Sequence, residues 1–269
     1  MLIPVDGSDA SVRAVSVAGR IARRLGSPVQ LLSIVSDQAE VDARGKWLLD
    51  VATEHLTDIA ATTAVAVADD VVDEIVNVAE PGDLVAMATA GSVRFHSGHF
   101  GSVAEGVARA LGRPMLMVGP NVDPHPGEPT QRVIAPIDGS VHSTAAVEPA
   151  ATLAKVLGVP LWLVTVESPI AVAGEAGSHS GVVSDADETY LQGLARRVAE
   201  SHGLEAQHEV LLSENPDRAI VDFAGDDGTV VMSTHGRSGI SRLFAGSTTA
   251  GVVSHSPRAV AVISPEEAD

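Results

Sequence analysis

The feature that most constrains this chain is an internal repeat of domain length. Residues 3–8 read IPVDGS, and residues 135–140, at an offset of 132, read APIDGS. Three later landmarks, Gly91, Gly101 and Ser102, recur as Gly236, Gly246 and Ser247 at an offset of 145 residues. Ordered self-similarity of this kind indicates a duplicated structural unit. The chain is therefore predicted to consist of two tandem copies.

A segment rich in proline and glycine separates the copies. Residues 119–129 hold four prolines and two glycines in eleven residues. Proline disfavours helix in the residue before it, so this segment is predicted to be a linker. We predict two domains, residues 1–120 and 131–269. The Gly/Ser-rich stretch 174–181 is predicted to be an inserted loop that accounts for the change in offset.

Composition limits the class of protein. The chain has 269 residues, 45% of them hydrophobic, 3% aromatic and none cysteine, so Val, Ala, Leu and Ile must fill the core. The absence of cysteine excludes disulfides, thiolate metal sites and cysteine nucleophiles. A net charge of −18 argues against nucleic acid or anionic lipid as partner. No signal peptide or apolar run of membrane-spanning length is recognised, so we expect a soluble, cytoplasmic protein. Trp47 and Trp162 are interpreted as packing residues.

Each copy reads as alternating strands and helices. Short apolar runs predict strands at 2–5, 29–35, 62–67, 84–88 and 114–118, and at 131–137, 161–166, 206–212, 229–233 and 258–263. Helices are predicted at 9–25, 38–60, 70–79 and 101–111, and at 141–157, 183–202, 214–225 and 247–255. Valine-rich strands alternating with helices favour a parallel sheet covered on both faces. The predicted fold is α/β, with two tandem doubly wound, Rossmann-like domains of five strands each.

This topology predicts where a ligand binds. Open parallel sheets bind ligands at the carboxyl ends of strands, where the strand order reverses. Asp6 and Asp138 close the first strand of each copy, and a glycine-containing loop after the fourth strand leads into a helix at Ser102 or Ser247. Unpaired N–H groups and the helix dipole make such a helix start an anion site. We expect nucleotide phosphate there, with the aspartate accepting hydrogen bonds from ribose or base. The alternative is that Gly-Ser is a plain N-cap and the aspartate only a turn residue.

Motifs of fast phosphoryl transfer and of hydrolysis are missing. The chain has neither GxxxxGK[ST] nor GxGxxG after a first strand, and no GxSxG elbow follows a strand. We therefore expect nucleotide binding, with no catalytic residue assigned. His96, His99 and His179 lack nearby carboxylates at ligand spacing, so no metal site is predicted. Arg237 and Arg242 are candidates to offset phosphate charge, the alternative being ordinary solvated arginines.

These residues resemble the universal stress protein family, here in tandem form. The ATP-binding subgroup of that family carries Gly-x2-Gly-x9-Gly-[Ser/Thr] after its fourth strand and an aspartate at the end of the first. The pattern falls on Ser233-x2-Gly236-x9-Gly246-Ser247 and on Ala88-x2-Gly91-x9-Gly101-Ser102, so the first glycine is replaced in both copies. The family's Thr-His-Gly stands at 234–236, whereas the first copy has Ala90 in place of the histidine. The resemblance covers nearly the whole chain and implies an adenine nucleotide alpha hydrolase-like fold that binds ATP, with or without Mg²⁺.

By this resemblance, both copies carry nucleotide contacts. Those of the second copy fall on Pro136, Ile137, Asp138, Val166, Met232, Ser233, Gly236, Gly246, Ser247, Thr248 and Thr249. Those of the first fall on Val5, Asp6, Ile34, Met87, Gly91, Gly101 and Ser102. Val166 would offer backbone groups to the adenine. Because Val103 and Ala104 replace the two threonines that follow Ser247, the first site is expected to bind more weakly.

The resemblance implies an ATP-binding regulator of the stress response with at most slow hydrolysis. Two alternatives stay open: a nucleotide-free interaction protein, and a slow ATPase or nucleotidyl-transferring enzyme. The resemblance also implies that the copies form a pseudo-twofold pair through their last strands, 114–118 and 258–263. A homodimer of the whole chain is compatible with it.

Overall fold

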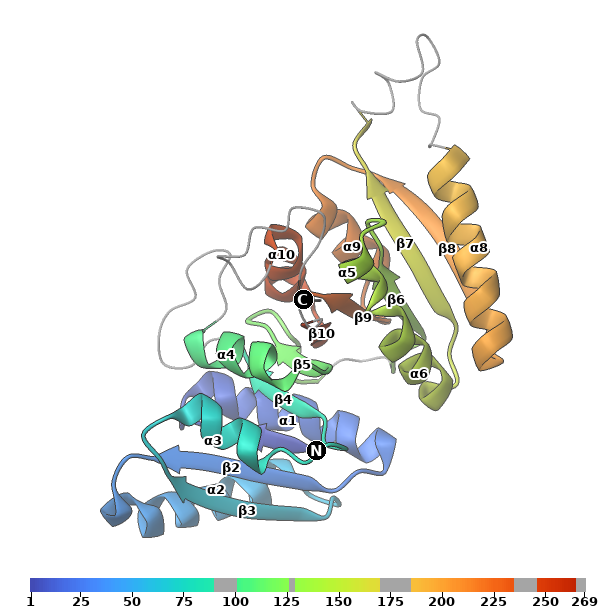
Figure 1. Cartoon of the computed structure of the whole chain (residues 1–269). Helices are drawn as coiled ribbons and strands as arrows, with labels where there is room; N and C mark the ends of the chain where they lie inside the picture. Colours follow the sequence, from blue (N-terminus) through green and yellow to red (C-terminus); the bar gives the residue numbers. More distant parts are fainter. Residues whose placement is uncertain (90–100, 126–128, 170–184, 235–245, 265–269) are drawn as a thin grey trace.

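The computed structural model describes residues 1–89, 101–125, 129–169, 185–234 and 246–264. Strands and helices alternate in both copies (Figure 1). The first copy comprises β1 (Leu2–Pro4), α1 (Asp9–Leu25), β2 (Val29–Val35), η1 (Gln38–Glu40), α2 (Val41–His55), β3 (Ala61–Val67), α3 (Val71–Val78), β4 (Val85–Ala88), α4 (Ser102–Leu111) and β5 (Met115–Val118). The second comprises β6 (Arg132–Pro136), α5 (Val141–Thr144), α6 (Val147–Leu157), β7 (Leu161–Glu167), α8 (Asp185–His202), β8 (Ala206–Leu212), α9 (Pro216–Ala224), β9 (Gly228–Ser233), α10 (Ser247–His255) and β10 (Val260–Ile263).

The described strands form one ten-stranded sheet in the order β3-β2-β1-β4-β5-β10-β9-β6-β7-β8. Within each copy the pairs are parallel and the order is third, second, first, fourth, fifth. The doubly wound prediction is thus confirmed. The copies meet where β5 pairs antiparallel with β10, Met117 opposite Val260 and Met115 opposite Val262. This is the pairing of last strands that the family resemblance implied.

Helices cover both faces of each half of the sheet, which explains the apolar strands. On β1 and β2, Ile3 and Leu31 pack in the same buried cluster as α1 and α2, whereas Leu2 and Leu32 pack with α3 and α4. Side chains of a strand alternate between faces, so a strand covered on both sides must be apolar throughout. Figure 1 shows the two halves, blue to green and yellow-green to red, on either side of the β5–β10 pair.

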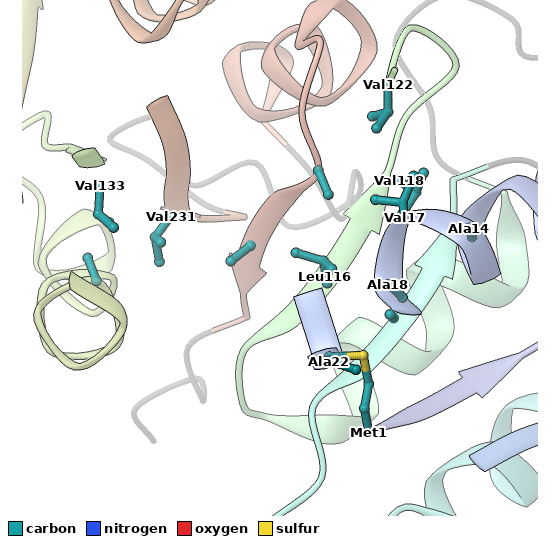
Figure 2. Close-up of a cluster of buried hydrophobic side chains, with 14 of the residues drawn as sticks. Met1, Ala14, Val17, Ala18, Ala22, Leu116, Val118, Val122, Val133 and Val231 are labelled. Atoms are coloured by element: carbon teal, nitrogen blue, oxygen red, sulfur yellow. The ribbon is translucent and has the colours of Figure 1, made fainter. Parts of the chain in front are cut away.

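One apolar cluster continues from the first copy into the second. Figure 2 shows Ala18 of α1 beside Leu116 and Val118 of β5, with Val231 of β9 and Val133 of β6 farther along the same layer. Alanines at three points of α1, Ala14, Ala18 and Ala22, are fully buried. Small residues at this spacing allow a helix to lie close to the sheet that it covers.

Two predicted helices differ from those observed. The predicted helix 141–157 is two helices, α5 and α6, joined by residues 145–146. Pro149 has no N–H to donate to the carbonyl of Ala145, and its ring crowds that carbonyl, so an unbroken helix is disfavoured. The predicted helix 38–60 begins with the 3-10 turn of η1 and ends at His55, with Leu56 outside helical geometry. Other boundaries shift by one or two residues, and residues 183–184 lie outside the described part of the chain.

The chain leaving β5 packs along α10 of the other copy. An ideal Cβ on Gly119 would lie 2.0 Å from the carbonyl oxygen of Val253. The Asn121 side-chain amide donates to the Ser254 carbonyl at 2.9 Å, and the Asp123 N–H donates to Pro257 at 3.0 Å. The first copy therefore contacts the carboxyl end of a helix whose amino end is a predicted phosphate site.

None of the helices in the described ranges combines the length and apolar character needed to cross a bilayer.

Candidate functional site

The candidate site of each copy lies where the order of strands reverses. β1 pairs with β2 on one side and β4 on the other, and β6 pairs likewise with β7 and β9. The connections from β1 and β4 pass to opposite faces of the sheet, which leaves a crevice at the carboxyl ends of these strands. Into this crevice lead the Asp-Gly-Ser turn after the first strand and the start of the helix after the fourth.

The Asp-Gly-Ser turn contains the same main-chain to carboxylate hydrogen bond in both copies. Oδ1 of Asp6 accepts from the Ser8 N–H at 2.9 Å and the Ser8 hydroxyl at 2.6 Å, and Oδ1 of Asp138 accepts from the Ser140 N–H at 3.0 Å. The intervening Gly7 has φ of +91°, a conformation that L side chains rarely adopt. The turn role considered from the sequence is thus present in both aspartates. It is compatible with ligand binding, because a carboxylate accepts several hydrogen bonds.

The first aspartate is held ionised. Partial burial acts to raise the pKa of Asp6, but hydrogen bonds from the side chain and backbone of Ser8 and the side chain of Ser11 outweigh it. The pKa of Asp6 therefore lies below its ordinary value of 3.8. A ligand in this site meets a negative hydrogen-bond acceptor at neutral pH.

This lowered pKa predicts a pH-dependent contribution to stability. Because the folded pKa of Asp6 lies below the unfolded one, its stabilisation is complete above the unfolded value and is lost as pH falls through the folded value. Asp6→Asn is expected to melt below wild type at pH 7, with the gap closing as the pH is lowered below about 4. Thermal melting across pH measures it, and Asp50→Asn, an exposed carboxylate on α2, controls for net charge. A gap that stays constant down to pH 2 contradicts the assignment.

The helices after β4 and β9 begin with amides that could hold an anion. Gly101 and Gly246 are the N-cap residues, and neither helix start has a side-chain cap hydrogen bond among the described residues. Each cap N–H donates back to the strand end, Gly101 to Thr89 at 2.5 Å and Gly246 to Thr234 at 2.8 Å. The next three N–H groups have no carbonyl within their own helix, and the helix dipole favours negative charge beside them. This arrangement fits a phosphate group.

The hydroxyls predicted at the second helix start have different roles. Ser247 is exposed and Thr248 half-buried, whereas Thr249 is buried and its hydroxyl donates to the Ser233 carbonyl at 2.9 Å. Thr249 thus joins α10 to the end of β9, and its hydroxyl proton serves that contact. The difference between the copies then rests on Thr248, with Val103 in the first.

The predicted strand-end residues gather around the crevice mainly through their backbone. Side chains of Val5, Ile137, Met87, Met232 and Ser233 are buried, and those of Ile34, Pro136 and Val166 are half-buried. A ligand would therefore meet mostly main-chain groups here. The predicted contacts Gly91 and Gly236, and the side chains His96, His99, His179, Arg237 and Arg242, lie outside the described residues. Within the described ranges no group of three His, Asp or Glu residues is placed to hold a metal ion.

One cation at the first crevice was missed from the sequence. Arg44 of α2 lies against the Asp6–Gly7 turn, its Nη1 3.4 Å from the Asp6 carbonyl oxygen. Its Cζ lies 5.2 Å from the ring centroid of Trp47, one helical turn along α2. An arginine three residues before a tryptophan on a helix was the available signal, because such residues share a face.

Comparison with known proteins agrees with this architecture. The model of the universal stress protein family matches residues 1–119 and 129–264. The chain belongs to the universal stress protein family. It carries the family domain twice, which confirms the tandem resemblance found in the sequence.

Curated universal stress proteins match at low identity. Universal stress protein Mb2028c of Mycobacterium bovis is 26% identical over 195 residues, 71% of this chain and 65% of the relative. Slr1230 of Synechocystis is 27% identical over 164 residues, 60% of this chain and 50% of the relative. A universal stress protein of Mycolicibacterium smegmatis is 27% identical over 139 residues, 49% and 47% respectively. The chain thus spans about half to two thirds of the length of these relatives.

A solved structure shares the arrangement of the whole chain. The crystal structure of a universal stress protein from Archaeoglobus fulgidus has a TM-score of 0.66 at 22% identity, covering 98% of this chain and 97% of that one. At this identity the likeness establishes the fold alone, including the tandem arrangement of two α/β units.

Proposed function

We propose that this universal stress protein binds ATP at the strand-order reversal of each copy and acts as a nucleotide-dependent regulator of the stress response. One observation carries the proposal: in both copies an Asp-Gly-Ser turn and a helix start with glycine at its N-cap lie at the same reversal of strand order. The amides fit phosphate and the aspartate fits the ribose or base.

Binding, with at most slow hydrolysis, suits the chemistry of the site. The second helix start is preceded by no lysine that could reach the terminal phosphates, and no Walker-type motif occurs in the chain. Any Mg²⁺ would enter with the phosphates, since this ion keeps several waters and is usually held by few protein oxygens.

Substitution of the N-cap glycines tests the proposal. In Gly246→Asp the carboxylate caps the first-turn amides, as aspartate does readily at N-caps, so the helix gains a side-chain cap while phosphate is repelled. We expect ATP affinity at the second site to fall at least about 100-fold, because two charge-assisted hydrogen bonds contribute about 3 kcal/mol or more. Gly101→Asp is the corresponding change in the first copy. Calorimetric titration with Mg-ATP measures both.

Gly246→Ala is the matched control. An added Cβ there would find its nearest neighbour, the Thr234 carbonyl oxygen, at 3.7 Å, an ordinary contact, so ATP binding should be retained. The first site is expected to bind ATP more weakly than the second, so Gly101→Asp should remove the weaker of two binding events. Equal loss from both aspartate variants contradicts this ranking.

The nucleotide-free alternative has one observation in its favour. Asp6, Asp138 and Thr249 already make hydrogen bonds within the protein, so the crevice is held in shape without a ligand. Acid release of co-purified ligand followed by nucleotide chromatography separates the two functions. Protein that carries no nucleotide and gives no heat with added ATP would establish the interaction protein instead.

A further inference from the structure

The guanidinium of Arg44 lies against the main chain of the first aspartate. It lies between the ring of Trp47, 5.2 Å from Cζ to the centroid, and the turn after β1. An ideal Cβ on Gly7 would be 2.6 Å from Nη1, so the end of the arginine side chain lies directly over this glycine. Trp47 is itself packed against the buried cluster, which limits movement of the pair. A preorganised guanidinium loses little freedom on forming hydrogen bonds.

Arg44 lies at the end of the proposed nucleotide site that would hold the nucleobase. The turn that it touches follows β1, and β1 pairs with β2, Pro4 opposite Leu32. The phosphate end lies on the other side of β1, where β4 leads toward α4. A nucleotide whose phosphates reach Gly101 therefore brings its base or ribose toward Arg44.

Donors and acceptors belong to the same turn at this end. Arg44 offers a fork of N–H donors and contacts the main-chain carbonyl of Asp6, whose carboxylate, ionised at neutral pH, is an acceptor on the same residue. A phosphate group at this end would be repelled by the negative charge of Asp6. A neutral base that carries adjacent acceptors and adjacent donors complements both groups. Guanine does so, with O6 and N7 as acceptors for arginine and N1–H and N2–H₂ as donors, whereas adenine carries a donor in place of O6.

We propose that the first copy, through Arg44 and Asp6, selects guanine over adenine nucleotides. This inference rests on the proposed function, because it assigns the base to a site whose phosphate end is argued above. The two copies would then prefer different bases, in agreement with the expectation that the first site binds ATP more weakly.

The sequence of the second copy has no arginine that corresponds to Arg44. No arginine or lysine occurs between Lys155 and Arg196, a stretch that includes β7 and the first half of α8. At the 145-residue offset that aligns β3 with β8, Thr189 corresponds to Arg44. The sequence of the second copy therefore has no arginine at the position that corresponds to Arg44, and the second site is expected to retain a preference for adenine.

The test uses the full chain with the second site closed by Gly246→Asp. Calorimetric titrations with Mg-GTP and Mg-ATP then report on the first site. We expect GTP to bind about 10-fold more tightly than ATP, within the range measured for an arginine fork on guanine. Adding Arg44→Lys, which keeps the charge without the fork, should bring the ratio close to one. Arg44→Gln should do the same.

Lys46→Gln is the control, because it removes a positive charge from an exposed position of the same helix and should leave the ratio unchanged. Thermal melting verifies that each variant is folded. Equal affinity for GTP and ATP in the Gly246→Asp protein overturns the inference and leaves nucleotide binding standing. An unchanged ratio in folded Arg44→Lys overturns it as well. If neither nucleotide binds the first site, the inference fails together with that half of the proposed function.

Discussion

Gly119→Ala is expected to destabilise the protein by about 3 kcal/mol or more, at the upper end of overpacking substitutions. The added Cβ would lie 2.0 Å from the Val253 carbonyl oxygen and 3.1 Å from its carbonyl carbon, both backbone atoms of α10. A flexible side chain could move away from such a contact, whereas a helix backbone must shift as a unit. Because α10 begins at the second candidate phosphate site, we also expect weaker ATP binding there. Thermal or urea unfolding and ATP titration measure the two effects.

Gly82→Ala provides the matched control for this substitution. Gly82 lies in the first copy, has no atom within 4 Å of an added Cβ and is not among the glycines with positive φ. Its change is expected to leave stability within about 0.5 kcal/mol, or to raise it slightly by restricting the unfolded chain. If Gly119→Ala matched Gly82→Ala, the close approach of β5 to α10 would be refuted.

Leu116→Ala is expected to cost about 2–5 kcal/mol of unfolding free energy. Leu116 is 4% exposed, pairs with Ala261 across the joint and lies in the cluster that runs through both copies. Its truncation removes apolar contacts and leaves a cavity that small neighbours such as Ala18 and Ala22 cannot fill. Since the cavity borders both copies, we expect them to lose stability together. Urea unfolding followed by circular dichroism and by the summed fluorescence of Trp47 and Trp162, one in each copy, shows whether the chain unfolds in one transition or in two.

Leu49→Ala controls for the loss of leucine as such. Leu49 is 57% exposed on α2, so its truncation should change stability by no more than about 0.5 kcal/mol. Unfolding of one copy at lower urea with the other unaffected would show that the joint does not couple them.

Much of the fold followed from patterns local to the sequence. The paired Asp-Gly-Ser segments and repeated glycines predicted two copies, and the spacing of apolar residues predicted each strand within one or two residues. Such patterns are readable because side-chain periodicity directly reflects which face of an element is buried. The break before α6 was also readable, from Pro149, and was missed.

The candidate site likewise combines features that the sequence predicted with contacts that only the structure shows. The Asp-Gly-Ser turns and the glycine N-caps are local, and the structure places them as the spacing indicated. The donation from Thr249 to Ser233 and the position of Arg44 over Gly7 join residues 16 and 37 positions apart. From the sequence alone, Thr249 could equally have faced a ligand, and Arg44 could have faced solvent.

The residues alone therefore determined the duplicated α/β units, and the Asp-Gly-Ser turn and helix start at each crevice, because turns and helix caps depend on neighbours in the chain. Tertiary structure decided how those units combine. The antiparallel β5–β10 pair joins them into one sheet, Gly119 packs on α10, and Arg44 occupies the space left by Gly7. Contacts between distant segments depend on the path of the whole backbone, and that path is set by the packing of both copies at once.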